Sequence, residues 1–356
     1  MRIVAYQHYS YSIDGLREAI DASHIGTSRQ PRKSQDEIVS ILWTTFFLGI
    51  FELMNDSTGH GWQQHIIHGT FMAMKASGPS SCRSMAGMAF FAQARIFEIS
   101  RTILFNEPTF LTGPEWMALS RDLSIKGNPV ETQNPWLPLD SLLDIMVMCS
   151  DLRVRAATFI QKQQNTPDAE ATSEAIAIST NGYLLREALI NWSSAYIPDQ
   201  LPINNTRETP SCDNLNNDHP GFGPQNSHEV AADMSKLLAR IFYASISIYL
   251  SGVFDYELFY WQHLRLIVPT LDEILIEQHL NTILALTELG LNRTDLSPLL
   301  FLFPLRIAGA RSCQQWQRDK ISALVAHVNK LFAVAAAIDN DLATVWKLRA
   351  VVQNPM

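Results

Sequence analysis

Apolar residues recur at intervals of three and four along nearly the whole chain, which is the spacing of one face of an α-helix. The clearest segment begins with Ser34 and Glu37, which match a helix-starting capping box, and continues with apolar residues at Ile38, Leu42 and Leu53. No segment sustains the alternation of apolar and polar residues that is typical of a strand. The sequence therefore predicts an all-α fold.

The chain has 356 residues, enough to bury a large core. We expect a single multi-helix domain over residues 1–356, built either as one compact body or as two closely packed helical halves. Residues 198–228 are rich in Pro and Asn and lack apolar periodicity, so they are predicted to form a long mobile loop within that domain. Helices are predicted at about residues 62–75, 85–106, 139–164, 170–196, 229–254, 259–268, 272–289, 298–310, 313–335 and 339–351.

The charge balance is acidic, with 27 Lys and Arg against 35 Asp and Glu, a formal net charge of −8. Binding to a nucleic-acid backbone needs a dense basic face, and the only basic group along the sequence is Arg29, Arg32 and Lys33. These three residues are typical of a solvated loop. We therefore expect no direct nucleic-acid contact from this chain alone.

Four cysteines lie far apart in the sequence, at Cys82, Cys149, Cys212 and Cys313. None is part of a CxxC pair, which argues against a structural zinc site built from cysteine. We expect reduced thiols, no bound metal and no cofactor.

The N-terminal residues have no apolar core of signal-peptide length and carry charges throughout. The most apolar stretch, residues 38–54, is interrupted by Thr44, Thr45 and Glu52 and is expected to fall short of a membrane span. The sequence thus predicts an intracellular protein that does not enter a membrane.

One candidate ligand pocket is formed by Trp62, His65 and His68. On a helix, the two histidines share a face and could meet a metal or a substrate, with Glu52 as the nearest plausible orienting partner. The alternative is that these imidazoles make ordinary polar contacts in the core or at the surface.

A second candidate group follows Asp255 and consists of Tyr256, Tyr260, Trp261 and His263. Aromatic residues at this density could line a small-molecule pocket. They could equally fill a junction between helices, with their hydroxyl groups bonded to the backbone.

Arg95 lies on an otherwise apolar helical stripe between Phe91 and Phe97. A guanidinium in this setting has to be paired, and Glu52 or Glu98 could supply the negative charge. A structural ion pair is the expected role, and recognition of a ligand is the alternative.

Common catalytic motifs are absent: there is no GxSxG, HExxH, P-loop or complete GxGxxG sequence. We therefore assign no catalytic residue. The alternative function is a metabolite-processing enzyme that uses His65 and His68 as acid–base groups, with Tyr260 or His263 across the pocket. A third reading is a pure scaffold or a truncated gene product.

The order of several short segments resembles the fungal-specific transcription factor domain, the helical region that follows the binuclear zinc cluster in many fungal activators. The resemblance covers about residues 10–350. It rests on Phe51-Glu52, Trp62-x-x-His65-x-x-x-Gly69, Gly78-Pro79, Phe90-Phe91-x-x-x-Arg95, Phe110-Leu111, Glu115-Trp116, Phe303-Pro304-Leu305-x-Ile307-Ala308-Gly309, Arg318 and Val345-Trp346.

This resemblance implies a nuclear regulator of transcription. Family members usually begin with six zinc-binding cysteines, which are missing here, so the chain is expected to act without its own DNA-binding zinc cluster. It would then work through protein partners such as other transcription regulators, or through a small-molecule effector. Some family members without the cluster control natural-product genes, which implies a secondary-metabolite gene set as a target.

Overall fold

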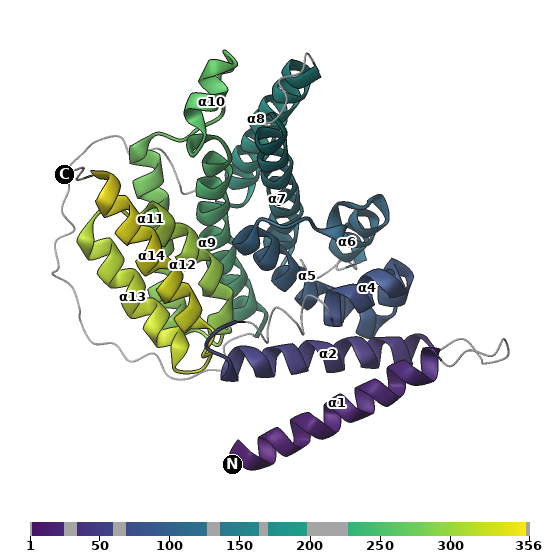
Figure 1. Cartoon of the computed structure of the whole chain (residues 1–356). Coiled ribbons are helices and arrows are strands. Elements are labelled where there is room, and N and C mark those ends of the chain that lie inside the picture. The colour runs from purple at the N-terminus through teal and green to yellow at the C-terminus, as the bar shows by residue number, and fades with distance from the viewer. Residues whose placement is uncertain are drawn as a thin grey trace.

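A computed structural model describes residues 2–24, 34–59, 69–126, 136–163, 170–197 and 227–353, and every regular element within these ranges is a helix (Figure 1). The predicted all-α fold is confirmed. The α-helices are α1 (Arg2–His24), α2 (Gln35–Asn55), α4 (Met72–Ser77), α5 (Met85–Phe105), α6 (Pro114–Lys126), α7 (Leu137–Gln163), α8 (Glu170–Tyr196), α9 (Ser227–Asp255), α10 (Leu258–His263), α11 (Glu273–Arg293), α12 (Leu302–Arg311), α13 (Gln315–Asn329) and α14 (Ala335–Gln353). Short 3-10 helices lie at Pro79–Cys82, Phe110–Thr112 and Pro298–Phe301.

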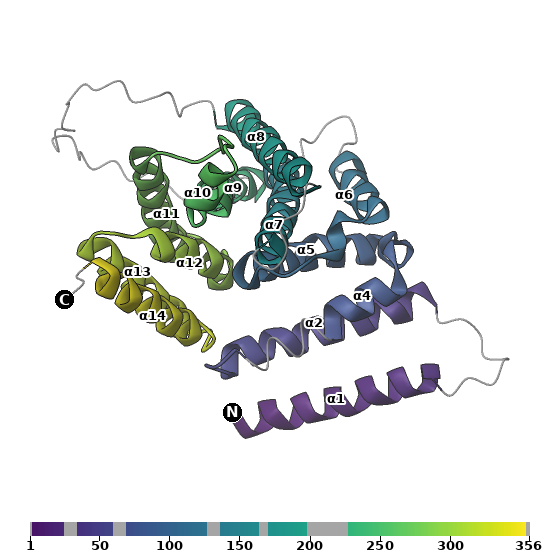
Figure 2. The same ribbon diagram turned by 45° about the horizontal axis from the view of Figure 1, so that its top comes forward.

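Helix α9 is the centre of the core and packs against α7, α8, α11 and α12. Its side chains are buried on nearly all sides, and Phe242, Ile246 and Phe254 are fully enclosed. A helix that is apolar all round is stable only when neighbours cover every face. Figures 1 and 2 show these neighbours, with α7 and α8 on one side of α9 and the C-terminal helices on the other.

Helices α1 and α2 lie side by side along one edge of the molecule (Figures 1 and 2). The predicted capping box is present: the Ser34 hydroxyl accepts from the Glu37 backbone N–H, and the Glu37 carboxylate accepts from the Ser34 N–H. The ring of Tyr9 on α1 stacks on Phe51 with centroids 4.6 Å apart, and its hydroxyl donates to Glu52. These contacts join α1 to the rest of the fold.

Two helical segments, α2 and residues 233–255 of α9, are long and apolar enough to cross a membrane by length and composition. Helix α2 contains residues 38–54 and passes with a mean hydropathy of 1.6 despite Glu52, and the prediction that this stretch does not span a membrane stays a prediction. Core helices pass the same test, so it is weak evidence for a span. Within the structure, α2 packs against α5 and 89% of the α9 window is buried.

The C-terminal helices α12, α13 and α14 form a packed group joined to the rest of the core through α11 and α9. The Trp346 indole on α14 donates to the Gly309 carbonyl on α12 at 2.8 Å. The Val334 N–H donates to the Leu53 carbonyl at 3.1 Å, which joins the start of α14 to the end of α2. Segments from both ends of the chain are therefore in direct contact.

Two of the predicted helices end earlier than expected. The segment predicted as one helix over 313–335 ends at Asn329, and a turn precedes α14. The segment predicted over 259–268 ends at His263, because Arg265 takes a left-handed conformation with φ of 58°. Residues 60–68 and 198–226, which include most of the predicted helix at 62–75 and of the predicted loop, lie outside the described residues.

Candidate functional site

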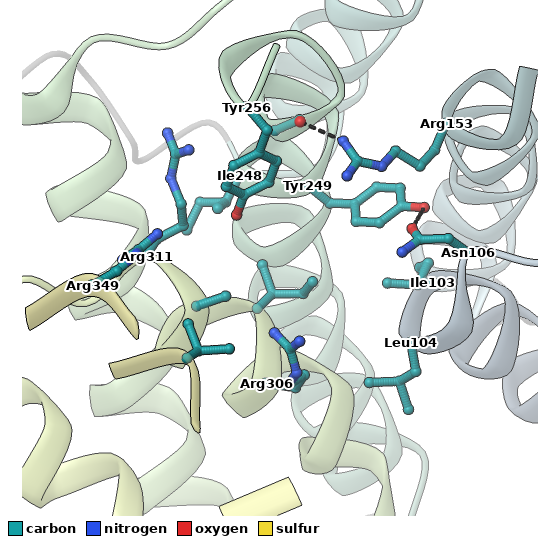
Figure 3. Close-up of a pocket in the computed structure, with 14 residues that line it drawn as sticks. Ile103, Leu104, Asn106, Arg153, Ile248, Tyr249, Tyr256, Arg306, Arg311 and Arg349 are labelled. Atoms are coloured by element: carbon teal, nitrogen blue, oxygen red, sulfur yellow. Dashed lines mark hydrogen bonds between the residues drawn. The ribbon is translucent and has the colours of Figure 1, made fainter. Parts of the chain in front are cut away.

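A cavity of about 290 Å³ lies where five helices meet, and four arginines surround it (Figure 3). The end of α5, helices α7 and α9, and the C-terminal helices α12 and α14 each contribute to its wall. Its apolar surface comes from Ile103, Leu104, Ile248, Ile307, Ala310 and Val345. The polar lining comes from Asn106, Arg153, Tyr249, Tyr256, Arg306, Arg311 and Arg349. We refer to this cavity as the arginine pocket.

The ring of Tyr256 lies between two guanidinium groups at one side of the pocket. The Arg153 guanidinium carbon is 5.4 Å from the ring centroid, and that of Arg311 is 5.5 Å from it. Cations are attracted to the faces of aromatic rings at such distances. Gly252, one helical turn earlier on α9, leaves the space for this ring, because a Cβ there would lie 2.9 Å from a Tyr256 ring carbon.

Two of the four arginines are neutralised by carboxylates. Arg311 forms an ion pair with Asp255 at 2.6 Å, and that carboxylate also accepts from the Ser251 hydroxyl. Arg306 pairs with Asp341 on α14. These pairs hold the guanidinium groups of α12 in place at the pocket wall.

The other two arginines, Arg153 and Arg349, have no carboxylate within ion-pair distance in the part of the chain that the structure describes. Arg153 donates to the Gly252 carbonyl, which fixes its orientation without cancelling its charge. The pocket wall therefore carries an excess of positive charge, although the whole chain is acidic.

Asn106 and Tyr249 lie on the same side of the pocket as Arg153 (Figure 3). Asn106 follows α5 in a left-handed conformation with φ of 53°, which asparagine tolerates better than most residues. Its side-chain oxygen accepts from the Tyr249 hydroxyl at 3.2 Å. Burial raises the pKa of Tyr249, so its hydroxyl stays protonated and keeps this hydrogen bond at neutral pH.

Among the described residues, the lining of the pocket contains no carboxylate, imidazole or thiol group. Its polar groups are guanidinium, phenol and carboxamide, of which guanidinium is the strongest and binds carboxylate and phosphate groups through two parallel hydrogen bonds. The arrangement is therefore suited to binding a negatively charged group next to an apolar one.

A second, larger cavity of about 630 Å³ adjoins the arginine pocket and shares Arg311 and Arg349 with it. The lining of this second cavity also contains Arg318 and the two glutamates Glu273 and Glu277. Among the described residues that line the two cavities, carboxylates therefore occur only in the second one.

The residues of the first predicted site, Trp62, His65 and His68, lie outside the described residues. Of the second group, Tyr256 lines the arginine pocket. Trp261 instead is fully buried between α7 and α9, where it stacks on Phe159 with centroids 6.1 Å apart.

Tyr260 and His263 do not line the arginine pocket. Tyr260 packs edge-on against Phe159, and His263 is exposed at the end of α10. Tyr260 and Trp261 are in contact with each other, with ring centroids 5.6 Å apart, so the two aromatic residues share a junction between helices, and a ligand site at the second group stays a prediction.

Arg95 is 1% exposed and is paired, but the predicted partners Glu52 and Glu98 were wrong. Its Nη2 atom is 2.6 Å from Asp140 Oδ1, and its Nη1 atom is 3.3 Å from Asp144 Oδ1. Glu98 pairs instead with Arg101, which lies one turn further along the same helix. Arg95 points from α5 toward α7, a direction that depends on helix packing.

Sequence reasoning missed the arginines of the pocket. Arg153, Arg306, Arg311 and Arg349 come from three helices and are spread over almost 200 positions, so no local spacing connects them. Two weak signals were available: Ile307 and Val345, which belong to segments that carried the family resemblance, contribute to the pocket wall.

Comparison with known proteins gives one match. The family described as "Fungal specific transcription factor domain" matches residues 2–354. Searches of curated proteins and of solved structures found no match. Since the family match spans nearly the whole chain, the protein belongs to the fungal specific transcription factor domain family, and this membership supports a regulatory role in transcription.

Proposed function

We propose that this chain is a single regulatory domain, residues 1–356 with the segment 198–228 as an internal loop, that responds to a small-molecule effector in the arginine pocket. Family membership supports the regulatory role. The observation that carries the effector site is the position of the pocket at the junction of α5, α7, α9, α12 and α14.

The position of the pocket couples distant parts of the chain. A ligand in the pocket would contact α5 and α7 on one side and α12 and α14 on the other. The residue just before α14, Val334, in turn donates its backbone N–H to the Leu53 carbonyl on α2. A ligand that binds one packing of these helices more tightly than another shifts the population toward that packing, and so changes the surface that a partner protein meets.

The proposal assigns DNA recognition to partner proteins, such as other transcription regulators in the nucleus. The net charge of −8 disfavours a phosphate backbone, and the arginines Arg306 and Arg311 are engaged by carboxylates. The four cysteines are too scattered in sequence to match a zinc cluster. A secondary-metabolite gene set is the proposed target. No observation on the described residues favours the enzymatic alternative, since His65 and His68 lie outside them.

A reporter assay tests the effector site. The chain is fused to an unrelated DNA-binding domain, and expression of a reporter gene with that domain's binding sites is measured in fungal cells. Ala310 lines the pocket, so Ala310→Phe fills it, while Ala310→Ser is the matched control.

We expect the fusion to change reporter expression relative to the DNA-binding domain alone. Ala310→Phe should alter that effect by several fold at equal protein level and unchanged helical content, and Ala310→Ser should not. Equal reporter expression from the parent fusion and Ala310→Phe would contradict the proposed role of the pocket.

A further inference from the structure

The charge balance of the arginine pocket indicates what kind of effector it takes. Four guanidinium groups line the pocket, whereas only Asp255 and Asp341 pair with them, and neither carboxylate lies on the lining itself. Arg153 and Arg349 remain without a carboxylate among the described residues. Two positive charges at a partly enclosed wall favour a ligand that carries two negative charges, or one small group of high negative charge density.

The hydrogen-bonding capacity of these groups is also in excess. Each guanidinium carries five N–H donors, and Arg153 uses one of them on the Gly252 carbonyl. The side-chain carboxamide of Asn106 faces the same cavity, with its oxygen engaged by Tyr249. The pocket therefore offers donors that need acceptors, and an oxyanion supplies them.

The remaining wall is apolar. Ile103, Leu104, Ile248, Ile307 and Val345 provide a surface that excludes water and favours a hydrocarbon or aromatic group. The volume of about 290 Å³ lies at the lower end for small-molecule sites, which are on the order of 300–1,000 Å³. This size suits a compact organic molecule better than a nucleotide or a peptide.

The adjoining cavity indicates that an anion would bind in the arginine pocket and not on the other side of the shared arginines. Glu273 and Glu277 lie on the lining of that second cavity and would repel a negatively charged group there. No such residue lines the arginine pocket. Arg349 lines both cavities, so its charge is available to a ligand in the arginine pocket.

We propose that the effector is a compact organic anion, with a carboxylate or phosphate group held by Arg349 and an apolar body lying against Ile103, Ile248 and Ile307. This inference rests on the proposed function, because it names the chemical class of the effector at the same site. Tyr256 is a positioning residue: its ring, which lies between Arg153 and Arg311, keeps both guanidinium groups oriented toward the cavity.

Binding of defined probes to the purified full chain tests this class. The probes are phenyl phosphate and phthalate, which combine an aromatic ring with an anionic group, and benzamide, a neutral analogue. Inorganic phosphate serves as an anion without an apolar body. Thermal unfolding and isothermal titration calorimetry measure binding, and the two anionic probes distinguish a phosphate from a carboxylate group.

We expect phenyl phosphate or phthalate to raise the melting temperature and to bind at least about tenfold more tightly than benzamide and inorganic phosphate. Arg349→Gln should weaken that binding by about tenfold or more, and the fold should be retained because Arg349 forms no ion pair with a described residue. Arg293→Gln is the matched control, since Arg293 is exposed at the end of α11 outside the pocket.

Three outcomes would overturn the ligand class: no binding of either organic anion at millimolar concentration, equal binding of benzamide, or anion binding that Arg349→Gln leaves unchanged. The reporter assay separates this failure from failure of the proposed function. If the anions do not bind while Ala310→Phe still alters reporter expression, the effector is not an anion. If they bind through Arg349 while Ala310→Phe has no effect on expression, the site is real but does not regulate transcription.

Discussion

Arg95 on α5 and Asp140 on α7 form a buried ion pair across 45 positions of sequence, with arginine Nη2 2.6 Å from aspartate Oδ1. Asp144, one turn further along α7, contacts the same guanidinium. The Arg95 side chain also lies 5.8 Å from the Phe91 ring centroid. This group of contacts fixes how α5 and α7 pack, and both helices contribute to the arginine pocket.

Removing the arginine should destabilise the fold strongly. Arg95→Ala takes a fully buried guanidinium away from the nearly buried Asp140 and the partly exposed Asp144, and loss of one partner of a buried pair costs about 3–5 kcal/mol. Urea unfolding should show the loss of stability as a lower urea concentration at the unfolding midpoint. Arg17→Ala, which removes an exposed i,i+3 pair with Asp14, should change stability by less than about 0.5 kcal/mol. Equal stability of the two variants would show that the buried pair has no structural role.

Two glycine substitutions should act in opposite directions. A Cβ on Gly309 would lie 2.5 Å from Leu342 Cδ2, at the contact between α12 and α14. Gly309→Ala is therefore expected to destabilise the protein by about 1–3 kcal/mol through overpacking. Gly15→Ala on α1 meets no atom within 4 Å and should stabilise that helix by about 0.5–1 kcal/mol. Thermal unfolding of both variants measures whether each substitution raises or lowers the melting temperature. A stabilised Gly309→Ala variant would contradict the tight α12–α14 contact.

Acid should destabilise the fold through His279. Burial lowers the pKa of this imidazole from 6.5 to about 4, and its ring lies edge-on to Tyr243 with centroids 5.7 Å apart. At a pH well above the unfolded-state pKa, the imidazole is neutral in both the folded and the unfolded chain, and His279 contributes nothing to the pH dependence of stability. As the pH falls below 6.5, the unfolded chain takes up the proton first, and stability decreases until the folded-state pKa is reached.

From about pH 7.5 to about pH 5, this single group should cost about 2 kcal/mol of unfolding free energy. His279→Gln removes the titration and should flatten the pH dependence by that amount. His263→Gln, at an exposed position on α10, serves as the control. Identical pH profiles for the His279→Gln variant and the parent chain would rule out a buried neutral imidazole.

Thiol labelling should be selective in the folded protein. Burial raises the pKa values of the Cys149 and Cys82 thiols, and both side chains are enclosed, whereas Cys313 is exposed. Only the thiolate reacts with alkylating agents. In a Cys212→Ser background, iodoacetamide should modify Cys313 first and the other two only after unfolding. Mass spectrometry of the native protein checks this, and rapid modification of Cys149 without denaturant would contradict the described packing.

Local features of the fold followed well from the sequence. The capping box at Ser34 and Glu37 is present, and α8 has the bounds that its pattern predicted. These features depend on residues within one or two turns of each other, so a linear pattern contains them. The prediction of one helix over 313–335 was wrong because its end depends on a contact between residues far apart in the sequence. Its break after Asn329 places Val334 against Leu53 of α2, a contact that local spacing does not encode.

The site depended on tertiary structure to a much greater extent. The sequence showed that Arg95 needs a partner, because an isolated charge on an apolar stripe is costly to bury. It did not show which one, since Asp140 comes within reach only once α7 packs on α5. Tyr256 was identified among several aromatic residues, but the arginines on either side of its ring come from α7 and α12.

The sequence by itself determined the helical class, most helix positions and the family, since these follow from local periodicity and from the order of short segments. Tertiary structure alone decided which charges meet: it brought Arg153, Arg306, Arg311 and Arg349 to one cavity, where, within the described ranges, two of them pair with carboxylates. The physical reason is that electrostatic interactions depend on distance in space. Distances between side chains on separate helices are set by the packing of the whole core.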